Sequence, residues 1–378
     1  MKVIIIGALA ESLVNFRGDL IKSLVASGHE VVAMAGQADG ITVTAIEALG
    51  ASFRPYPVQR NGMNPRQDLA TFLALRSAVY DIKPDIILAY TIKPVIWGGL
   101  ASLIERVPSF FALVEGLGYA FQGGSWRRRL VGRIASMLYK VSLYNADKVI
   151  FLNPDNRKHF LDSGLIRYSQ AEMIDGIGLD TDWYGLKPLP AQGAVFLCIA
   201  RLLGEKGLRE YAQAATIVKE KYPDAKFHLV GQPDPSPDGI PLAEVEAWHA
   251  SGAVKYSGVF NDVRPFIEEC SVYVLASYHE GMPRTVMEAM SMGRPILTTD
   301  VPGCRETVIS GENGYLVPKQ NTEALAERMI WFIENREQWD RMGQASRRIA
   351  EERFDVHKIN AQMLRIMGLR ADLDCGLA

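Results

Sequence analysis

Two glutamates eight positions apart, Glu280 and Glu288, combine the residue type and the spacing that chemistry on a ligand would need. They belong to the run E-G-M-P-R-T-V-M-E-A (280–289), which follows the apolar run 272–276. An apolar run that breaks off and resumes at helical period predicts strand, loop and helix. Glu280 then lies in the loop, and Glu288 lies more than one turn into a helix that Pro283 opens. Two acidic acceptors on either side of free backbone N–H groups suit a ligand with hydroxyls at both ends and phosphates in the middle.

Two cations, Arg201 and Lys206, follow another predicted strand in the run A-R-L-L-G-E-K-G (200–207). Cations with glycines beside them, at a turn from strand to helix, supply what a diphosphate needs: neutralisation of charge and close approach of the backbone. Cations at strand ends are also common on ordinary surfaces. Arg201 and Lys206 alone would therefore not identify a site. They indicate a diphosphate site once Glu280 and Glu288, in the same half of the chain, are taken into account.

The elements that must position these residues alternate along the whole chain. Short apolar strands, several of them apolar on both faces, alternate with helical segments, which is typical of a parallel sheet covered by helices on both sides. In the first half we expect strands at 3–6, 31–35, 86–89, 110–114 and 149–152, and helices near 14–27, 65–82, 93–105 and 126–145. In the second half we expect strands at 194–200, 226–231, 254–257, 272–276 and 295–299, and helices near 207–221, 262–269, 283–292, 322–335 and 336–354.

This alternation predicts an α/β protein of two doubly wound, Rossmann-like domains, residues 1–185 and 190–354. The stretch 183–193, rich in proline and glycine, is interpreted as a linker. Two such domains that face each other would hold a ligand in the cleft between the carboxyl ends of their strands. The amphipathic segment 356–369 has no sheet of its own to complete, so we expect a C-terminal helix that crosses back and completes the first domain with residues 355–378.

Composition and charge exclude several other classes of protein. The apolar share of 48% and the charged share of 22% are ordinary for a globular chain, and a net charge of -2 gives no general case for nucleic-acid binding. Four cysteines without a C-x-x-C pair and six scattered histidines predict reduced thiols in the cytoplasm and no metal site built by the protein. No apolar run approaches the roughly 18 residues that span a bilayer, so we expect a soluble or peripheral protein.

Taken together, the motifs resemble those of glycosyltransferase family 4, retaining enzymes of the GT-B fold. The resemblance rests on the two runs quoted above and on G-R-P-I-L-T-T-D-V-P-G-C-R-E-T-V and G-E-N-G-Y-L-V within 293–317, and more loosely on D-G-I-G-L-D-T-D at 175–182. It implies transfer of a hexose-type sugar from a nucleoside-diphosphate sugar, which we expect to be UDP-linked. It implies neither a metal nor another cofactor.

The resemblance also assigns roles to residues of this chain. Glu280 would contact the donor sugar and Glu288 the ribose hydroxyls, while Arg201 and Lys206 would bind the diphosphate. Fixed cations in a water-poor site stabilise the charge that develops on the departing nucleoside diphosphate, so Arg201, Lys206 and Glu280 are the expected catalytic residues. The remaining donor contacts are expected from the loop and the first turn of the helix, at Gly281, Met282, Pro283, Arg284 and Thr285.

One residue, Glu115 in V-E-G-L-G-Y (114–119), departs from the family pattern, because many members carry a histidine there. We interpret it as an acceptor contact or a base, and capping of the following loop remains an alternative. The segment from Gly7 lacks G-x-G-x-x-G, which argues against a nicotinamide dehydrogenase. Gly7 and Asn15 are expected to face the acceptor instead.

The run W-R-R-R-L-V-G-R-I-A-S-M-L-Y-K-V-S-L-Y (126–144) carries only positive charge, interleaved with apolar residues. It predicts binding to an anionic membrane surface, at the inner face of the cell membrane, through Trp126, Arg127, Arg128, Arg129 and Arg133. A helix packed on the sheet with a solvated basic edge would explain the apolar stripe equally well.

A basic, membrane-facing helix would suit a polyprenyl-diphosphate-linked glycan as acceptor, in the assembly of a bacterial surface polysaccharide or glycoprotein glycan. Two alternatives remain open. One is a nucleotide-sugar epimerase or hydrolase of the same fold. The other is a non-catalytic scaffold that binds nucleotide sugar at the membrane.

Overall fold

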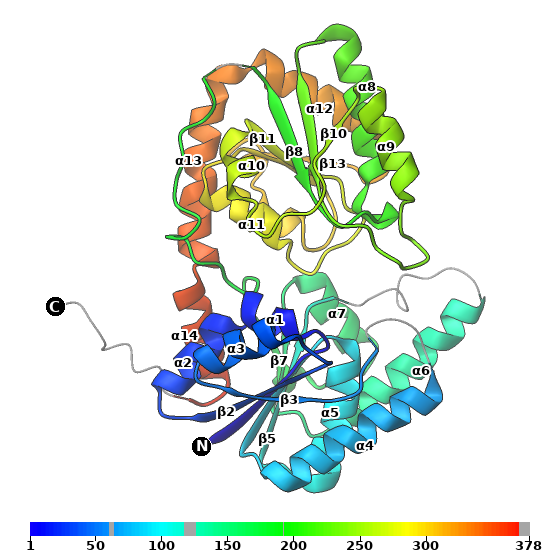
Figure 1. Ribbon diagram of the computed structural model, residues 1–378, viewed down its shortest axis with the longest axis vertical. Coiled ribbons are helices and arrows are strands. Elements are labelled where there is room, and N and C mark those ends of the chain that lie inside the picture. Colours follow the sequence, from blue (N-terminus) through cyan, green and yellow to red (C-terminus); the bar gives the residue numbers. More distant parts are fainter. Residues whose placement is uncertain (60–63, 117–125, 192, 370–378) are drawn as a thin grey trace, which may run out of the picture. The chain divides into compact units, whose positions relative to one another are not determined.

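The structure is a computed structural model that describes residues 1–59, 64–116, 126–191 and 193–369, with the side chains of 126–131 outside this set. The chain forms two compact units. The first comprises Met1–Gly178 and the C-terminal segment from His357, and the second comprises Leu179–Val356. Each unit contains one parallel sheet with helices packed on it (Figure 1).

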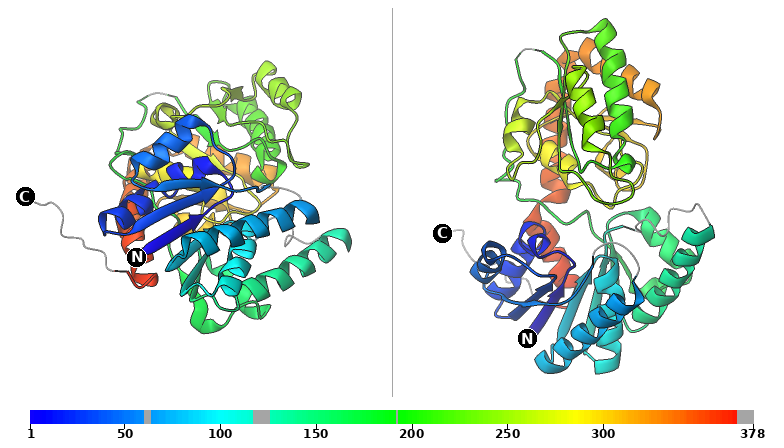
Figure 2. Two further views of the ribbon diagram at one scale, coloured as in Figure 1. Left: turned by 60° about the horizontal axis from the view of Figure 1, so that its bottom comes forward. Right: turned by 45° about the vertical axis from the view of Figure 1, so that its right-hand side comes forward.

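The first unit is built on seven parallel strands in the order β3-β2-β1-β4-β5-β6-β7. Its strands are β1 (Lys2–Ile6), β2 (Glu30–Ala35), β3 (Ser52–Pro55), β4 (Ile86–Tyr90), β5 (Ser109–Val114), β6 (Lys148–Phe151) and β7 (Ala171–Met173). Its helices are α1 (Ala10–Asn15), α2 (Gly18–Ala26), α3 (Gly40–Ala48), α4 (Pro65–Ile82), α5 (Ile92–Glu105), α6 (Trp126–Ser142), α7 (Pro154–Asp162) and α14 (Val356–Ile366). Helices α1 to α3 pack side by side, α4 to α6 form a second group, and the two groups cover opposite faces of the sheet (Figure 2).

The second unit is built on six parallel strands in the order β10-β9-β8-β11-β12-β13. Its strands are β8 (Val195–Ile199), β9 (Lys226–Val230), β10 (Lys255–Tyr256), β11 (Val272–Leu275), β12 (Ile296–Thr299) and β13 (Gly314–Val317). Its helices are α8 (Leu208–Lys221), α9 (Leu242–Ala250), α10 (Arg264–Glu269), α11 (Arg284–Ser291), α12 (Thr322–Glu334) and α13 (Trp339–Ile349). The predicted fold class, two doubly wound α/β units, is confirmed.

The central strands are buried because helices cover both of their faces. Every residue of β4, β8 and β11 is buried, which is why these segments are continuous apolar runs. In each sheet the strand order reverses at one place, between β1 and β4 in the first unit and between β8 and β11 in the second. Ligands of doubly wound proteins bind beyond the carboxyl ends of the strands at this reversal. The residues that follow these four strands therefore lie where a ligand would bind.

The stretch 183–193, interpreted above as a linker, belongs to the second unit instead. Arg294 is fully buried and donates Nη2 to the carbonyl oxygens of Lys187 at 2.9 Å and Pro188 at 3.0 Å. A distant arginine thus fixes an irregular backbone, and no local sequence pattern records this. The boundary between the units lies earlier, after Gly178.

The chain passes between the units twice, and the two crossings are hydrogen-bonded to each other. The N–H of Leu179 donates to the carbonyl of Phe354, and the N–H of Val356 donates to the carbonyl of Leu179, both at 2.9 Å. Helix α14 then joins the first unit, where Gln362 donates Nε2 to the carbonyl of Met173 in β7 at 2.9 Å. The predicted return of the C-terminal helix to the first unit is confirmed.

Candidate active site

Glu280 lies in the loop between β11 and α11, as predicted, and three contacts fix it. Lys206 Nζ lies 2.6 Å from Glu280 Oε1, and the hydroxyl of Ser277 donates to the same oxygen at 2.6 Å. The backbone N–H of Glu280 donates to the carbonyl of Pro302 at 3.0 Å. The two charged side chains are largely buried, with 13% of Lys206 and 15% of Glu280 exposed. The structure thus joins the ends of β8 and β11 through a preformed ion pair.

Two glycines allow the loops around this pair to approach one another. Gly207 has a φ of 66°, and a Cβ on it would lie 2.0 Å from the carbonyl oxygen of Ala276. Gly303 has a φ of 85°, and a Cβ on it would lie 2.5 Å from the carbonyl oxygen of Glu280. Only glycine combines this backbone conformation with so close an approach. The glycines of the quoted motifs therefore bring the loops after β8, β11 and β12 together.

Arg201 follows β8 but pairs with an acid that the sequence analysis missed. Its Nη1 donates to Oδ2 of Asp234 at 2.5 Å. Burial acts to raise the pKa of Asp234, but hydrogen bonds from Ser236 and the charge of Arg201 outweigh it and lower that pKa. In the same loop Asp238 accepts a hydrogen bond from the N–H of Glu205 at 2.8 Å. The run D-P-S-P-D-G after β9, dense in turn-forming acids, was the available signal.

Helix α11 carries Glu288 as predicted, but begins at Arg284, with Pro283 as its N-cap rather than its first residue. Arg284 donates Nε to Oε1 of Glu288 at 2.9 Å, and the phenol of Tyr184 bonds to both side chains. Burial raises the pKa of Glu288 above its ordinary value, while the charge of Arg284 and these hydrogen bonds partly oppose that shift. Tyr184, which the sequence analysis did not single out, completes a polar cluster around the buried Glu288, at the predicted ribose position.

The remaining residues of the loop that is predicted to bind the donor have contacts within the unit. Met282 and Pro283 are buried, and Gly281 is half-buried. The hydroxyl of Thr285 hydrogen-bonds to Tyr273, a fully buried residue whose own hydroxyl donates to the carbonyl of Ile199 at 3.1 Å. The first turn of α11 is thereby tied to β11 and β8.

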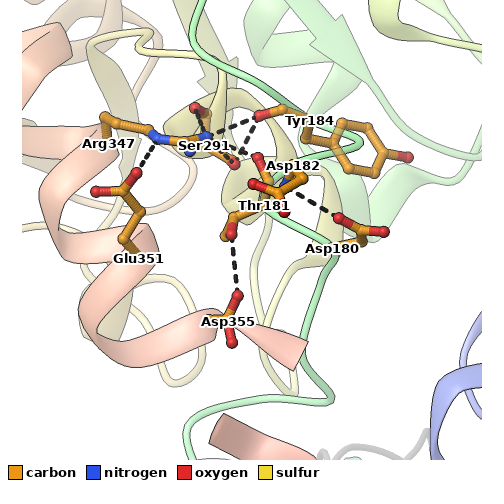
Figure 3. A network of polar contacts seen from close by, with 8 residues as sticks. All are labelled: Asp180, Thr181, Asp182, Tyr184, Ser291, Arg347, Glu351 and Asp355. Atoms are coloured by element: carbon orange, nitrogen blue, oxygen red, sulfur yellow. Dashed lines mark hydrogen bonds and ion pairs between the residues drawn. The ribbon is translucent and has the colours of Figure 1, made fainter. Parts of the chain in front are cut away.

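Arg347 fixes the other end of α11 (Figure 3). Its Nη1 donates to the carbonyl oxygens of Ser291 at 2.9 Å, Tyr184 at 3.1 Å and Thr181 at 2.8 Å. A cation beside the last carbonyls of a helix is favourable because the C-terminal end carries partial negative charge. The same guanidinium therefore holds the backbone of Tyr184, whose side chain reaches Glu288.

The predicted acceptor residues lie in the first unit. Glu115 follows β5 and forms an ion pair with Arg17, with Oε1 2.5 Å from Nη2. Gly7 follows β1 and is buried, and a Cβ on it would lie 2.2 Å from the hydroxyl of Tyr90. Asn15 is exposed at the last position of α1. The helix predicted near 14–27 is two helices, with Arg17 between them.

Helix α6 contains the predicted membrane-binding residues. The side chains of Trp126, Arg127, Arg128 and Arg129 lie outside the described residues. In the described part Arg133 is exposed, and so are the apolar side chains of Ile134, Met137 and Val141. These three lie at helical spacing along one face, and 71% of Met137 is exposed. The same helix also has a packed face, because Tyr139 is buried in the core and Leu138 packs against that core. The described part of α6 therefore shows the packing of the alternative together with an exposed apolar face.

Within the described ranges, no group of three or more His, Cys, Asp and Glu side chains could hold a metal ion. Nor does any helix among those residues combine the length and the apolar character needed to cross a membrane. Cys198, Cys270 and Cys304 are free and buried, and burial raises the pKa of each thiol to about 12. These three cysteines are therefore neutral at physiological pH. Cys375 lies outside the described residues.

Two family models match the chain, one for each unit. The model described as "Glycosyl transferase 4-like domain" matches residues 15–174, and the model described as "Glycosyl transferases group 1" matches residues 193–335.

Among curated proteins, the chain is 29% identical over 354 residues to an enzyme of Campylobacter jejuni subsp. jejuni, covering 89% of this chain and 90% of that protein. That enzyme is named N,N'-diacetylbacillosaminyl-diphospho-undecaprenol alpha-1,3-N-acetylgalactosaminyltransferase. The capsular polysaccharide biosynthesis glycosyltransferase CapM of Staphylococcus aureus is 23% identical over 308 residues, covering 76% of this chain and 79% of CapM.

Solved structures share the fold at low identity. HepE of Anabaena in complex with UDP-glucose has a TM-score of 0.79 at 21% identity, covering 97% of this chain and 99% of HepE. Sucrose-phosphate synthase of Thermosynechococcus elongatus has a TM-score of 0.78 at 19% identity, covering 97% and 98%. The two family models together match most of the chain, and each lies on one of its doubly wound units. This protein therefore belongs to glycosyltransferase family 4 and is a glycosyltransferase of the GT-B fold.

Proposed function

We propose that this glycosyltransferase transfers a hexose-type sugar from a UDP-sugar to a glycan carried on a polyprenyl diphosphate, with retention of anomeric configuration. The observation that carries the donor assignment is the ion pair between Lys206 and Glu280 beyond β8 and β11. It joins a cation suited to a diphosphate with a carboxylate suited to sugar hydroxyls, at the point of the sheet where doubly wound proteins bind ligands.

In this proposal the second unit binds the donor along its loops. The diphosphate interacts with Arg201 and Lys206, which neutralise the charge that builds up as the sugar–phosphate bond breaks. Glu280 accepts hydrogen bonds from the sugar, and Glu288 accepts them from the ribose. HepE, whose complex contains UDP-glucose, has the same fold, which supports UDP as the nucleotide.

Retention follows if the acceptor oxygen attacks the face from which the nucleoside diphosphate departs. The charge that needs stabilisation is then on the departing diphosphate, where the two cations act. The family resemblance supports this course. Measuring the anomeric coupling constant of the product by NMR tests it, and an inverted product would exclude it.

The acceptor assignment rests on the Campylobacter relative, whose name specifies an undecaprenol diphosphate carrier. The exposed apolar face of α6, with Arg133 and Lys140 beside it, is consistent with work at an anionic lipid surface. We propose that this face lies in the headgroup region of the membrane while the enzyme acts on its lipid-linked substrate, at the inner face of the cell membrane.

The deciding experiment measures UDP release from a panel of UDP-hexoses and UDP-N-acetylhexosamines, with and without polyprenyl-diphosphate-linked glycans. A glycosyltransferase that acts on a lipid-linked acceptor releases UDP from one donor and only when that acceptor is present. Release without acceptor would favour a hydrolase, and interconversion of UDP-sugars would favour an epimerase. Donor binding without turnover on any acceptor would favour a scaffold.

A further inference from the structure

In the first unit, a polar cluster around a buried arginine lies near the point where the strand order reverses, between β1 and β4. Arg17 is 3% exposed and lies in the turn between α1 and α2. Its guanidinium stacks over the ring of Tyr90, 4.5 Å from the centroid, and its Nη2 lies 2.5 Å from Oε1 of Glu115. Tyr90 ends β4 and shares a hydrogen bond of 2.7 Å with the hydroxyl of Ser12. The cluster thus joins α1, β4 and β5 beyond the carboxyl ends of the strands.

The two members of the ion pair differ in access. Arg17 is enclosed, because only 3% of it is exposed. Its Nη1 donates to the carbonyl of Phe16 at 3.0 Å, and its buried Nε has no hydrogen-bond partner among the residues that the structure describes. Glu115, by contrast, has 28% of its side chain exposed. A ligand at this end of the sheet can reach the carboxylate but not the guanidinium. Arg17 can therefore act on a ligand only through Glu115.

The backbone around the cluster is fixed. Thr91, directly after Tyr90, has a φ of 66°, a conformation that a β-branched residue adopts only when the surroundings impose it. Tyr56 is buried and donates its hydroxyl to the carbonyl of Gly7 at 2.7 Å, and Gly7 has no room for a side chain beside Tyr90. Such local strain is concentrated at ligand sites more often than in ordinary packing.

We infer that Arg17 is a positioning residue that holds Glu115 as a charge-matched hydrogen-bond acceptor for a hydroxyl of the acceptor sugar. This inference rests on the proposed function and chooses between the two roles left open for Glu115. Arg17 already engages Oε1 of Glu115, and the exposed part of the carboxylate can still accept a hydrogen bond from a hydroxyl. The ion pair stays intact in this arrangement, so Glu115 orients the acceptor rather than acting as its base.

The experiment uses the full chain with a UDP-sugar and a lipid-linked acceptor that support transfer by the wild type. Glu115→Gln removes the charge of the acceptor group, Arg17→Met removes the partner, and Arg17→Lys restores a cation. We expect the first two variants to raise the KM for the acceptor about tenfold to a hundredfold, the range of a hydrogen bond to a charged group. The kcat and the KM for the donor should change by less than about threefold, and Arg17→Lys should recover part of the loss.

The double variant Arg17→Met/Glu115→Gln distinguishes positioning from general destabilisation. If Arg17 acts through Glu115, the double variant is no worse than the poorer single variant, because the effects are coupled. Multiplicative effects would overturn the inference, and so would a fall in kcat that comes with loss of the acidic limb of the pH–rate profile, which is the signature of a base.

The controls keep a negative result interpretable. The thermal shift on adding UDP, which depends on the second unit in the proposed function, should be retained in each variant. If Arg17→Met does not fold, Glu115→Gln and Arg17→Lys still decide, and an unchanged acceptor KM in both overturns the inference. If the wild type uses no lipid-linked acceptor with any donor, the proposed function fails, and the inference fails with it. Transfer by the wild type together with an unchanged acceptor KM in the variants refutes the inference alone.

Discussion

Replacement of Lys206 by methionine tests both the catalytic role proposed for this lysine and its contribution to folding. Methionine keeps most of the length and the apolar stem of the side chain and removes only the ammonium group. If Lys206 stabilises the departing diphosphate, its loss resembles the loss of one oxyanion donor, about 10²–10³-fold in kcat or about 2.7–4 kcal/mol. The binding of the intact donor should weaken less, because the charge develops mainly in the transition state.

The same change also leaves Glu280 without its counter-charge. Losing one partner of a buried ion pair costs about 3–5 kcal/mol. Lys206 and Glu280 retain 13% and 15% exposure, and Ser277 still donates to the carboxylate, so we expect the lower end of that range, about 3 kcal/mol. For a unit of this size, a loss of about 3 kcal/mol corresponds to a Tm about 6–12 °C lower.

Two further variants separate these effects. Lys206→Met/Glu280→Gln removes both charges, so the Tm should recover much of its loss while UDP release from the donor stays low. Lys221→Met breaks the exposed pair with Glu334 and should leave both Tm and kcat unchanged. The measurements are calorimetric unfolding and acceptor-dependent UDP release under saturating donor. A folded Lys206→Met enzyme with a kcat within about threefold of wild type would refute the assignment of this lysine.

Three other predictions follow from the site and from α6. Burial raises the pKa of Glu288 above 4.5, the ordinary value for a glutamate, so this side chain becomes protonated at a higher pH than an ordinary glutamate does. The affinity for UDP, measured by calorimetry, should therefore weaken as the pH falls. Glu288→Gln should remove this dependence of UDP affinity on pH. If Glu288→Gln keeps the same pH dependence, another group is responsible. The protein should float with anionic liposomes. Flotation should fail for Arg127→Glu/Arg128→Glu/Arg129→Glu and weaken for Met137→Glu. Unchanged flotation of the triple variant would contradict binding of α6 to an anionic membrane. Transfer should persist in EDTA, since the two cations neutralise the diphosphate in the proposed function, and loss of activity restored by Mg²⁺ would contradict this.

Most of the strands that the sequence predicted are buried almost throughout, whereas the strands that it missed, β3, β7 and β13, are partly exposed. Strands such as β4 and β11 are apolar on both faces, so their composition alone identifies them. Strand β3, S-F-R-P, is a half-exposed edge strand with a charge and a proline, and β7 has only three residues. Helix α7 was also missed, although its sequence contains a recognisable start, with Asn153 as the N-cap and Pro154 as the first helical residue.

The site shows the same division. Glu280 and Glu288 lie where a strand–loop–helix pattern puts them, and the spacing of such residues is local information. Asp234, Tyr184 and Arg17 were missed because their partners lie far away in the chain, and only the folded arrangement brings them together. Glu288, for example, contacts Tyr184, a residue 104 positions earlier. The residues predicted to bind a ligand were thus easier to place from the sequence than the residues that hold them in position.

The paired crossings at Leu179 and Phe354–Val356 have a consequence for how this enzyme could be rebuilt. The second unit is one continuous segment whose two ends meet through hydrogen bonds of 2.9 Å, so topologically it is an insertion into the first unit. If the segment 179–356 were replaced by the corresponding segment of a relative, the two points of connection to the first unit would lie beside each other, as they do here. In the proposed function, a chimera of this kind would keep the native unit for the acceptor and would take its donor preference from the relative. Inserted modules with adjacent termini are the ones that tolerate such transplantation.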